Sequence, residues 1–243
     1  MPPMWSANGA SPPETEHTTS VYEQWFAASL GADVTIIEQQ GLGGSAVLTD
    51  VVPSKTLIAS ADAMTRFAEA ADLGVHVRGG SKDGDEINDL AVDLEKVNTR
   101  LLRLAASQSR DIKRGLERVG VKAIAGTGRL LSPTSVQVTT EDGLEYTLDA
   151  QAVMLAVGSL PRELPTAKPD GERIFNWKQV YHLTEVPEHM IVVGSGVTGA
   201  EFASAYRGLG AEVTLVSSRD QVLPGEDEDA AAVLESVFER RGM

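Results

Sequence analysis

The chain has 243 residues, of which 42% are hydrophobic, and a formal net charge of −14 at pH 7. This composition can bury a core in one large or two small domains. The acidic balance argues against a nucleic-acid or anionic-membrane partner, and the lack of cysteine excludes disulfides and thiol-based mechanisms.

No apolar run is long enough to predict a membrane span, and residues 1–20 lack the apolar core of a signal peptide. The default expectation is therefore a cytoplasmic protein. The four histidines have no ligand-like spacing, so no metal site is expected.

The N-terminal part of the chain predicts a flexible tail followed by a helix and a strand. Residues 1–20 hold four of the eleven prolines and read as disordered. Residues 22–30 resemble the end of a helix that stops at Gly31, and the apolar run 33–37 predicts a buried parallel strand.

Two helices and four short strands are predicted next. A helix over residues 54–71 would be capped by Ser54, and apolar spacing predicts a longer helix over 92–119 that closes at Gly120. The predicted strands cover 122–125, 135–139, 144–148 and 152–157. The second and third form a hairpin through Glu141-Asp142-Gly143, and the fourth is expected to be buried.

The most informative segment is residues 191–201, where an apolar strand runs directly into three glycines. Gly194 permits a sharp turn, Gly196 leaves room for a pyrophosphate, and Gly199 lets a helix lie close to the strand. A helix over 201–209 and a strand over 212–216 complete a dinucleotide-binding unit, in which Ser195 lies between the first two glycines. The alternative is a glycine-rich loop in some other α/β protein.

The end of the strand over 212–216 bears on the choice between NADH and NADPH. An acidic residue there would bind the ribose 2′-hydroxyl of NAD, but the chain has Ser217, Ser218 and Arg219. Neutral hydroxyls and a positive charge favour a 2′-phosphate, although Arg219 could equally be an ordinary loop arginine.

Four motifs stand in order along the chain at recognisable spacing. They are Gly43-Gly44-Ser45 after the strand-ending Glu38, Val52-Pro53-Ser54-Lys55, Gly126-Thr127-Gly128, and Ala156-Val157-Gly158-Ser159-Leu160-Pro161. With the glycine turn above, they resemble the pyridine nucleotide-disulfide oxidoreductases of the dihydrolipoamide dehydrogenase type, from about Tyr22 to the last residue. The resemblance is strongest to members that lack the redox cysteines and act as quinone reductases.

The resemblance implies an α/β fold with two Rossmann-like nucleotide-binding lobes. A disordered tail (1–20) would precede an FAD-binding domain (21–160) that contains a β-hairpin insertion. A linker (161–186) and a partial NAD(P)-binding domain (187–243) would follow.

The resemblance also implies site roles. Glu38 would bind the FAD ribose, with a plain strand-end charge as the alternative reading. Gly43, Gly44 and Ser45 would let the backbone approach the flavin dinucleotide, with a simple turn as the alternative. Thr127 and Gly128 would contact adenine, Gly158 belongs to the interdomain motif, and Lys55 would pair with Glu201 near the flavin.

The chain departs from the family pattern at the redox pair. Ala46 and Val51 occupy the two cysteine positions, so lipoamide and glutathione reduction by the family mechanism are excluded. Residues 1–20 also lack the glycine-rich FAD phosphate loop, with Gly9 alone, and Val157 replaces a threonine.

We therefore expect an FAD-dependent NAD(P)H oxidoreductase that passes electrons to a quinone-like acceptor. Relatives of this type are homodimers, but their dimer-forming domain has no counterpart here. The alternative is a truncated fragment that acts only as a nucleotide-binding module, or an inactive remnant. For this chain alone we expect weak or absent FAD binding.

Overall fold

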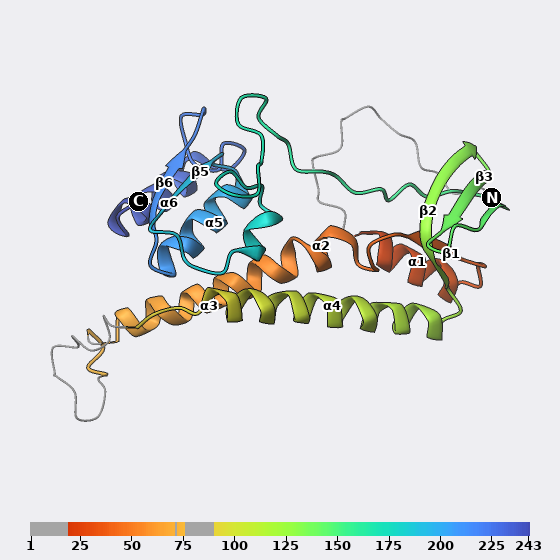
Figure 1. Cartoon of the computed structure of the whole chain (residues 1–243), viewed down its shortest axis with the longest axis horizontal. Helices are drawn as coiled ribbons and strands as arrows, with labels where there is room; N and C mark the ends of the chain where they lie inside the picture. Colours follow the sequence, from red (N-terminus) through yellow and green to blue (C-terminus); the bar gives the residue numbers. More distant parts are fainter. Residues whose placement is uncertain (1–18, 71, 76–89) are drawn as a thin grey trace.

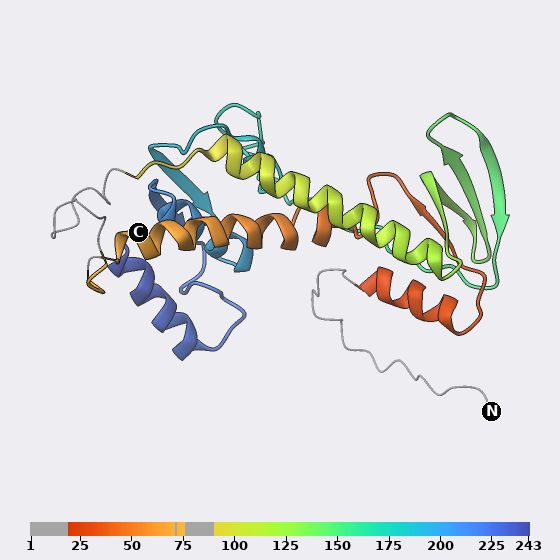
Figure 2. The same cartoon turned by 90° about the horizontal axis from the view of Figure 1, so that it is seen from below.

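The computed structural model describes residues 19–70, 72–75 and 90–243. Most of the expected tail over residues 1–20 lies outside the described residues. Two long helices, α3 (Val51–Ala68) and α4 (Leu94–Arg118), lie side by side, with one sheet near each end of α4 (Figure 1). Figure 2 shows the same arrangement from below, with α4 running from one sheet to the other.

The first sheet has four strands in the order β1-β2-β3-β4, at Thr35–Glu38, Lys122–Ser132, Ser135–Thr140 and Glu145–Asp149. The strand β1 pairs in parallel with β2, and the other pairings are antiparallel. The predicted hairpin is confirmed: Gly143 has φ 83°, and the amide of Thr140 donates to the carbonyl of Leu144 over 3.0 Å.

Helix α1 (Thr19–Ser29) precedes this sheet and ends before Gly31, which has φ 92°, as predicted. The five-residue helix α2 (Gly44–Leu48) connects β1 to α3. Helix α4 ends two residues before Gly120, whose φ of 86° suits the predicted glycine stop.

The second sheet pairs β5 (His189–Val193) in parallel with β6 (Glu212–Val216), and α5 (Val197–Gly208) connects them. All three predicted elements are confirmed, although α5 begins four residues earlier than expected. A short 3-10 helix, η2 (Gln179–His182), precedes this unit, and α6 (Glu228–Arg240) follows it.

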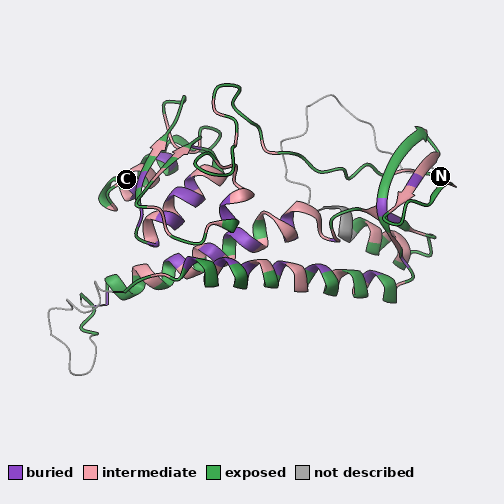
Figure 3. Cartoon of the chain, viewed as in Figure 1, coloured by how far each residue is buried: buried purple, intermediate pink, exposed green. Residues whose placement is uncertain are grey.

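The main core lies where α3, α4 and α5 meet (Figure 3). It contains Leu57 from α3, Leu101 from α4 and Tyr206 from α5, which are 1%, 0% and 0% exposed. Val213 of β6 packs into the same cluster. The long helices and the second sheet therefore share one hydrophobic core.

The predicted cap of α3 was wrong. The helix begins at Val51 after the N-cap residue Asp50, so Ser54 lies inside the first turn and is 3% exposed. The error arose because Pro53 was taken to precede the helix, whereas proline is well tolerated within a first helical turn.

The predicted buried strand over residues 152–157 was also wrong. This segment is irregular, and Leu155 and Val157 are 67% and 88% exposed. A strand needs a neighbouring strand for its backbone hydrogen bonds. This segment pairs with no strand of the two described sheets. Among the described helices, none is long and apolar enough to cross a membrane.

Substitution of Leu101 tests the shared core. Leu101→Ala should lower the free energy of unfolding by about 2–5 kcal/mol, because it leaves a cavity between the helices. Leu104→Ala on the same helix, where the leucine is 39% exposed, should cost less than about 1 kcal/mol. Urea denaturation measures both, and equal losses would contradict this assignment of the core.

Candidate functional site

The turn between β5 and α5 has the geometry that its glycines predict. Gly194 leaves β5 with φ 117°, in the region that favours glycine, and its amide donates to the carbonyl of Val216 over 2.8 Å. Gly196 is the N-cap of α5, and a Cβ built on it would meet no atom within 4 Å. The first turn of α5 therefore faces open space, as an approaching phosphate requires.

Gly199 has a different role in the same turn. A Cβ on Gly199 would overlap the carbonyl oxygen of Gly194 and lie 3.6 Å from a Val192 side-chain carbon. The missing side chain thus lets α5 lie close against β5, while the space beside Gly196 stays open.

Ser195 turns its side chain away from this open space. The residue is 4% exposed, and its hydroxyl lies 2.7 Å from the Ser217 hydroxyl and 3.3 Å from the carbonyl oxygen of Gln221. A ligand at the turn could therefore meet the backbone of Ser195 but not its hydroxyl.

Ser217, Ser218 and Arg219 lie directly after β6 and are all exposed. The Ser217 hydroxyl oxygen accepts a hydrogen bond from the amide of Arg219 over 2.9 Å. Arg219 has no ion-pair partner among the described residues. Its guanidinium is therefore available to an anionic group beside the turn.

Lys55 and Glu201 form an ion pair between α3 and α5, as predicted. The lysine side chain is 55% exposed and that of Glu201 is 26% exposed, so the pair contributes less than about 1 kcal/mol to stability. Its position at the junction of the two helices, rather than its energy, makes it a candidate functional group.

The ion pair has a buried tyrosine nearby that sequence analysis missed. Tyr181 of η2 is 2% exposed, and its ring packs on Phe202, with ring centroids 5.7 Å apart. Burial, followed by the charge of Asp50, raises the pKa of the Tyr181 hydroxyl, which has no hydrogen-bond partner in the described part of the chain. No signal marked it, because the stretch 161–187 holds four prolines and shows no helical or strand periodicity around Tyr181.

Glu38 ends β1, where its carboxylate caps the following turn. One carboxylate oxygen, Oε1, accepts from the amides of Gln40 at 2.7 Å and Gly41 at 3.4 Å. The residue is half-buried, and the other oxygen makes no hydrogen bond within the described residues. That oxygen could accept from a ribose hydroxyl.

The glycines after β1 divide into a packed and an open position. A Cβ on Gly43 would lie 2.5 Å from the Val47 side chain, whereas Gly44, with φ 57°, would meet nothing within 4 Å. Ser45 follows in α2, and its carbonyl accepts from the amides of Thr49 and Asp50.

The remaining predicted site residues lie apart from these groups. Thr127 and Gly128 are within β2 and pair with Thr139 and Val138 of β3. Gly158, with φ 67°, lies in the irregular segment that was expected to follow a strand.

The structure thus groups most of the predicted site residues into two clusters, and one ion pair, between Lys55 and Glu201, joins two helices. Glu38 ends β1 of the four-stranded sheet, and Gly43 and Gly44 lie at the start of α2. Gly194 and Gly196 lie between β5 and α5, and Arg219 follows β6. The sheet of β5 and β6 lies toward the other end of the long axis from the four-stranded sheet (Figure 1). The Lys55–Glu201 pair lies where α5 packs on α3, the helix that continues from α2.

The two positions expected for redox cysteines lie on consecutive helices. Ala46 of α2 is 5% exposed, and Val51, the first residue of α3, is 37% exposed. Neither side chain can exchange electrons.

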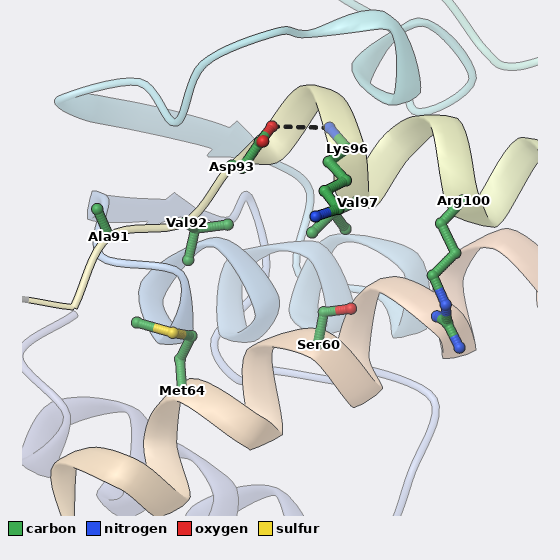
Figure 4. Close-up of a pocket in the computed structure, with 8 residues that line it drawn as sticks. All are labelled: Ser60, Met64, Ala91, Val92, Asp93, Lys96, Val97 and Arg100. Carbon is green, nitrogen blue, oxygen red and sulfur yellow. Dashed lines mark hydrogen bonds between the residues drawn. The ribbon is translucent and has the colours of Figure 1, made fainter. Parts of the chain in front are cut away.

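A hollow of about 300 Å³ lies between α3 and the beginning of α4 (Figure 4). It is lined by Ser60, Met64, Ala91, Val92, Asp93, Lys96, Val97 and Arg100. None of these is a predicted site residue, so the hollow is separate from both clusters.

Comparison with known proteins supports the assignment of this geometry. The sequence model described as pyridine nucleotide-disulphide oxidoreductase matches residues 24–243, nearly the whole chain. The chain belongs to this family. It is 47% identical over 216 residues to a Mycobacterium tuberculosis protein named NAD(P)H dehydrogenase (quinone), covering 86% of this chain and 42% of the relative.

More distant relatives are dihydrolipoyl dehydrogenases. The protein of that name from Chlorobaculum parvum is 33% identical, with 88% of this chain and 44% of the relative covered. The chain therefore spans less than half the length of these curated relatives.

The fold agrees with a solved structure of the family. The crystal structure of LpdA from Mycobacterium tuberculosis superposes with a TM-score of 0.80 at 45% identity, covering 91% of this chain and 48% of LpdA. The flavoprotein disulfide reductase RclA from Escherichia coli has a TM-score of 0.67 at 19% identity, which shows a shared fold.

Alanine substitutions can separate the roles of two glycines in the turn. Gly199→Ala should lower the free energy of unfolding by about 1–3 kcal/mol, because the added methyl overlaps the Gly194 carbonyl. Gly196→Ala should cost less than about 1 kcal/mol, because its φ of −70° suits alanine and the space is open, although alanine caps a helix less well than glycine. Thermal denaturation compares them, and equal destabilisation would contradict the assigned roles.

Proposed function

We propose that the chain forms the nucleotide-binding part of an FAD-dependent NAD(P)H oxidoreductase that passes electrons to a quinone-like acceptor rather than to a disulfide. The observation that carries this proposal is the ion pair between Lys55 and Glu201. It joins α3, the second helix after the glycines at 43 and 44, to α5, the helix after the glycine turn. The similarity to an NAD(P)H dehydrogenase (quinone) supports the acceptor class.

The residues present fit a nicotinamide dinucleotide. The space beside Gly196 and the free amides of the first turn of α5 suit a pyrophosphate, since a helix N-terminus favours anions. Ser218 and Arg219 would meet the adenosine ribose, and the absence of a carboxylate at the end of β6 favours NADPH.

The residues also fit part of a flavin dinucleotide. The unpaired oxygen of Glu38 suits a ribose hydroxyl, and Gly44 leaves its surroundings open. Gly43, Ser45, Thr127, Gly128 and Gly158 complete the proposed contacts. The segment expected to carry the phosphate loop falls in residues 1–20, mostly outside the described residues.

Lys55 would work through its positive charge. Glu201 holds the ammonium group at the junction of α3 and α5, where it can stabilise negative charge that develops nearby. The flavin, when bound, would accept a hydride from NAD(P)H and transfer two electrons to the acceptor. With alanine and valine at the cysteine positions, no residue of the chain takes electrons itself.

The proposal includes the domain division at 21–160, 161–186 and 187–243. It also includes a cytoplasmic location, a small-molecule acceptor as partner, and homodimerisation as a property of full-length relatives. The acidic net charge supports a protein that does not bind nucleic acid.

Flavin spectra test the proposal. The purified chain is titrated with FAD, and NADPH is then added without oxygen. We expect a weakly bound flavin whose absorbance is bleached faster than that of free FAD. Lys55→Met should slow this bleaching by about tenfold or more, since a charge near the reacting atoms is lost.

Lys113→Met is the matched control, because Lys113 forms an exposed ion pair with Glu117 on α4. It should leave the bleaching rate unchanged. An equal effect of both variants would contradict the proposed role of Lys55.

The second candidate function is a nucleotide-binding module without catalysis. The turn at Gly194, Gly196 and Gly199 favours this module, because the described residues include the whole turn together with the strand before it and the helix after it. NADPH binding measured by calorimetry, together with an FAD spectrum that the protein never changes, would favour this module over the oxidoreductase.

A further inference from the structure

The segment after β6, residues 217–223, is bonded at several points to the buried Ser195. The Ser195 hydroxyl contacts the Ser217 hydroxyl and the Gln221 carbonyl, and the Ser195 carbonyl accepts from the amide of Leu223 over 2.8 Å. Three positions of the segment 217–223 therefore bond to one residue of the glycine turn.

This segment is exposed over residues 217–220 and partly buried over 221–223. A hollow of about 250 Å³ lies between it and α6, lined in part by Phe238 and Met243. Apart from Ser195, the segment is held by Glu235 of α6, whose carboxylate accepts from the amide of Val222 over 2.7 Å. Hydrogen bonds to the glycine turn and to α6 thus help to fix its path.

Leu223 shows that this path is constrained. Its φ of 52° is the only positive value for a residue other than glycine within the described part of the chain, and leucine rarely adopts it. The bond from its amide to Ser195 helps to offset that cost.

The contact reaches Arg219 through Ser217. The Ser217 hydroxyl lies 2.7 Å from that of Ser195 and accepts from the Arg219 amide over 2.9 Å. The buried serine thereby fixes the backbone from which the unpaired guanidinium projects.

We propose that Ser195 is a positioning residue for nucleotide selectivity: it holds segment 217–223 so that Arg219 meets the 2′-phosphate of NADPH, without itself touching the nucleotide. This inference rests on the proposed function, because it assumes an adenosine ribose beside the end of β6. The preference for NADPH over NADH would then depend on Ser195 as well as on Arg219, which faces the ligand.

Two adenosine ligands that need no flavin test the inference. Calorimetry gives the affinity of the purified chain for adenosine 2′,5′-bisphosphate and for 5′-AMP, which differ only in the 2′-phosphate. Ser195→Ala should weaken the bisphosphate by about fivefold, equivalent to about one hydrogen bond, and change 5′-AMP by less than about twofold.

Ser204→Ala is the matched control. Ser204 lies on α5 and accepts from Arg241 over 3.1 Å, so the variant loses a serine hydrogen bond in the same lobe without affecting the segment. It should leave both affinities unchanged.

Arg219→Ala and the double variant decide whether Ser195 acts through Arg219. Arg219→Ala should weaken the bisphosphate selectively, and adding Ser195→Ala should cause no further loss, because the two residues form one unit. Ser217→Ala should reproduce the selective loss, and it replaces Ser195→Ala if that variant does not fold.

Several outcomes overturn the inference. Equal weakening of both ligands by Ser195→Ala would assign the serine to the turn as a whole, and additive losses in the double variant would show that it acts independently of Arg219. A wild-type chain that binds both ligands equally would contradict the contact between Arg219 and the 2′-phosphate, but not the proposed nucleotide site. A wild-type chain that binds neither would remove the proposed nucleotide site as well.

Discussion

The close packing of α5 on α3 is the constraint on which the candidate site depends. A Cβ on Gly208 would lie 3.2 Å from the side chains of Ala61 and Thr65, so the glycine allows the helices to approach. Tyr206 and Leu57 fill the core beside this contact. The packing brings Glu201 to Lys55, 146 residues earlier in the chain. Because an exposed ion pair stabilises little, it is the helix packing that determines this pairing.

Each residue of the glycine turn has a different structural role. Gly194 turns the chain, Gly199 admits the helix, and Gly196 keeps space open for a ligand. The Ser195 hydroxyl instead contacts the segment after β6. We therefore expect one turn to have two roles. Gly196 leaves space for a phosphate, and Ser195 fixes the segment whose residues are expected to meet the ribose.

The chemistry available to the chain follows from what its side chains can and cannot do. Ala46 and Val51 offer neither thiolate nor disulfide, so any electron transfer has to occur on a bound cofactor. The protein supplies backbone amides at a helix N-terminus, a carboxylate at the end of β1, and the paired charge of Lys55. In the proposed function these groups would bind and orient a cofactor and stabilise charge, as a diffusible two-electron acceptor requires.

The sequence by itself determined the elements whose signals are local. Helical periodicity predicted α4, the glycine stops predicted where α1 and α4 end, and the strand-turn-helix pattern predicted β5, α5 and β6. The family motifs predicted that Lys55 meets Glu201. Tertiary structure alone decided that residues 152–157 form no strand, since a strand needs a partner edge. It also decided that Tyr181 is buried beside α5 and that Ser195 faces inward, because burial and long-range hydrogen bonds depend on segments that meet only after folding.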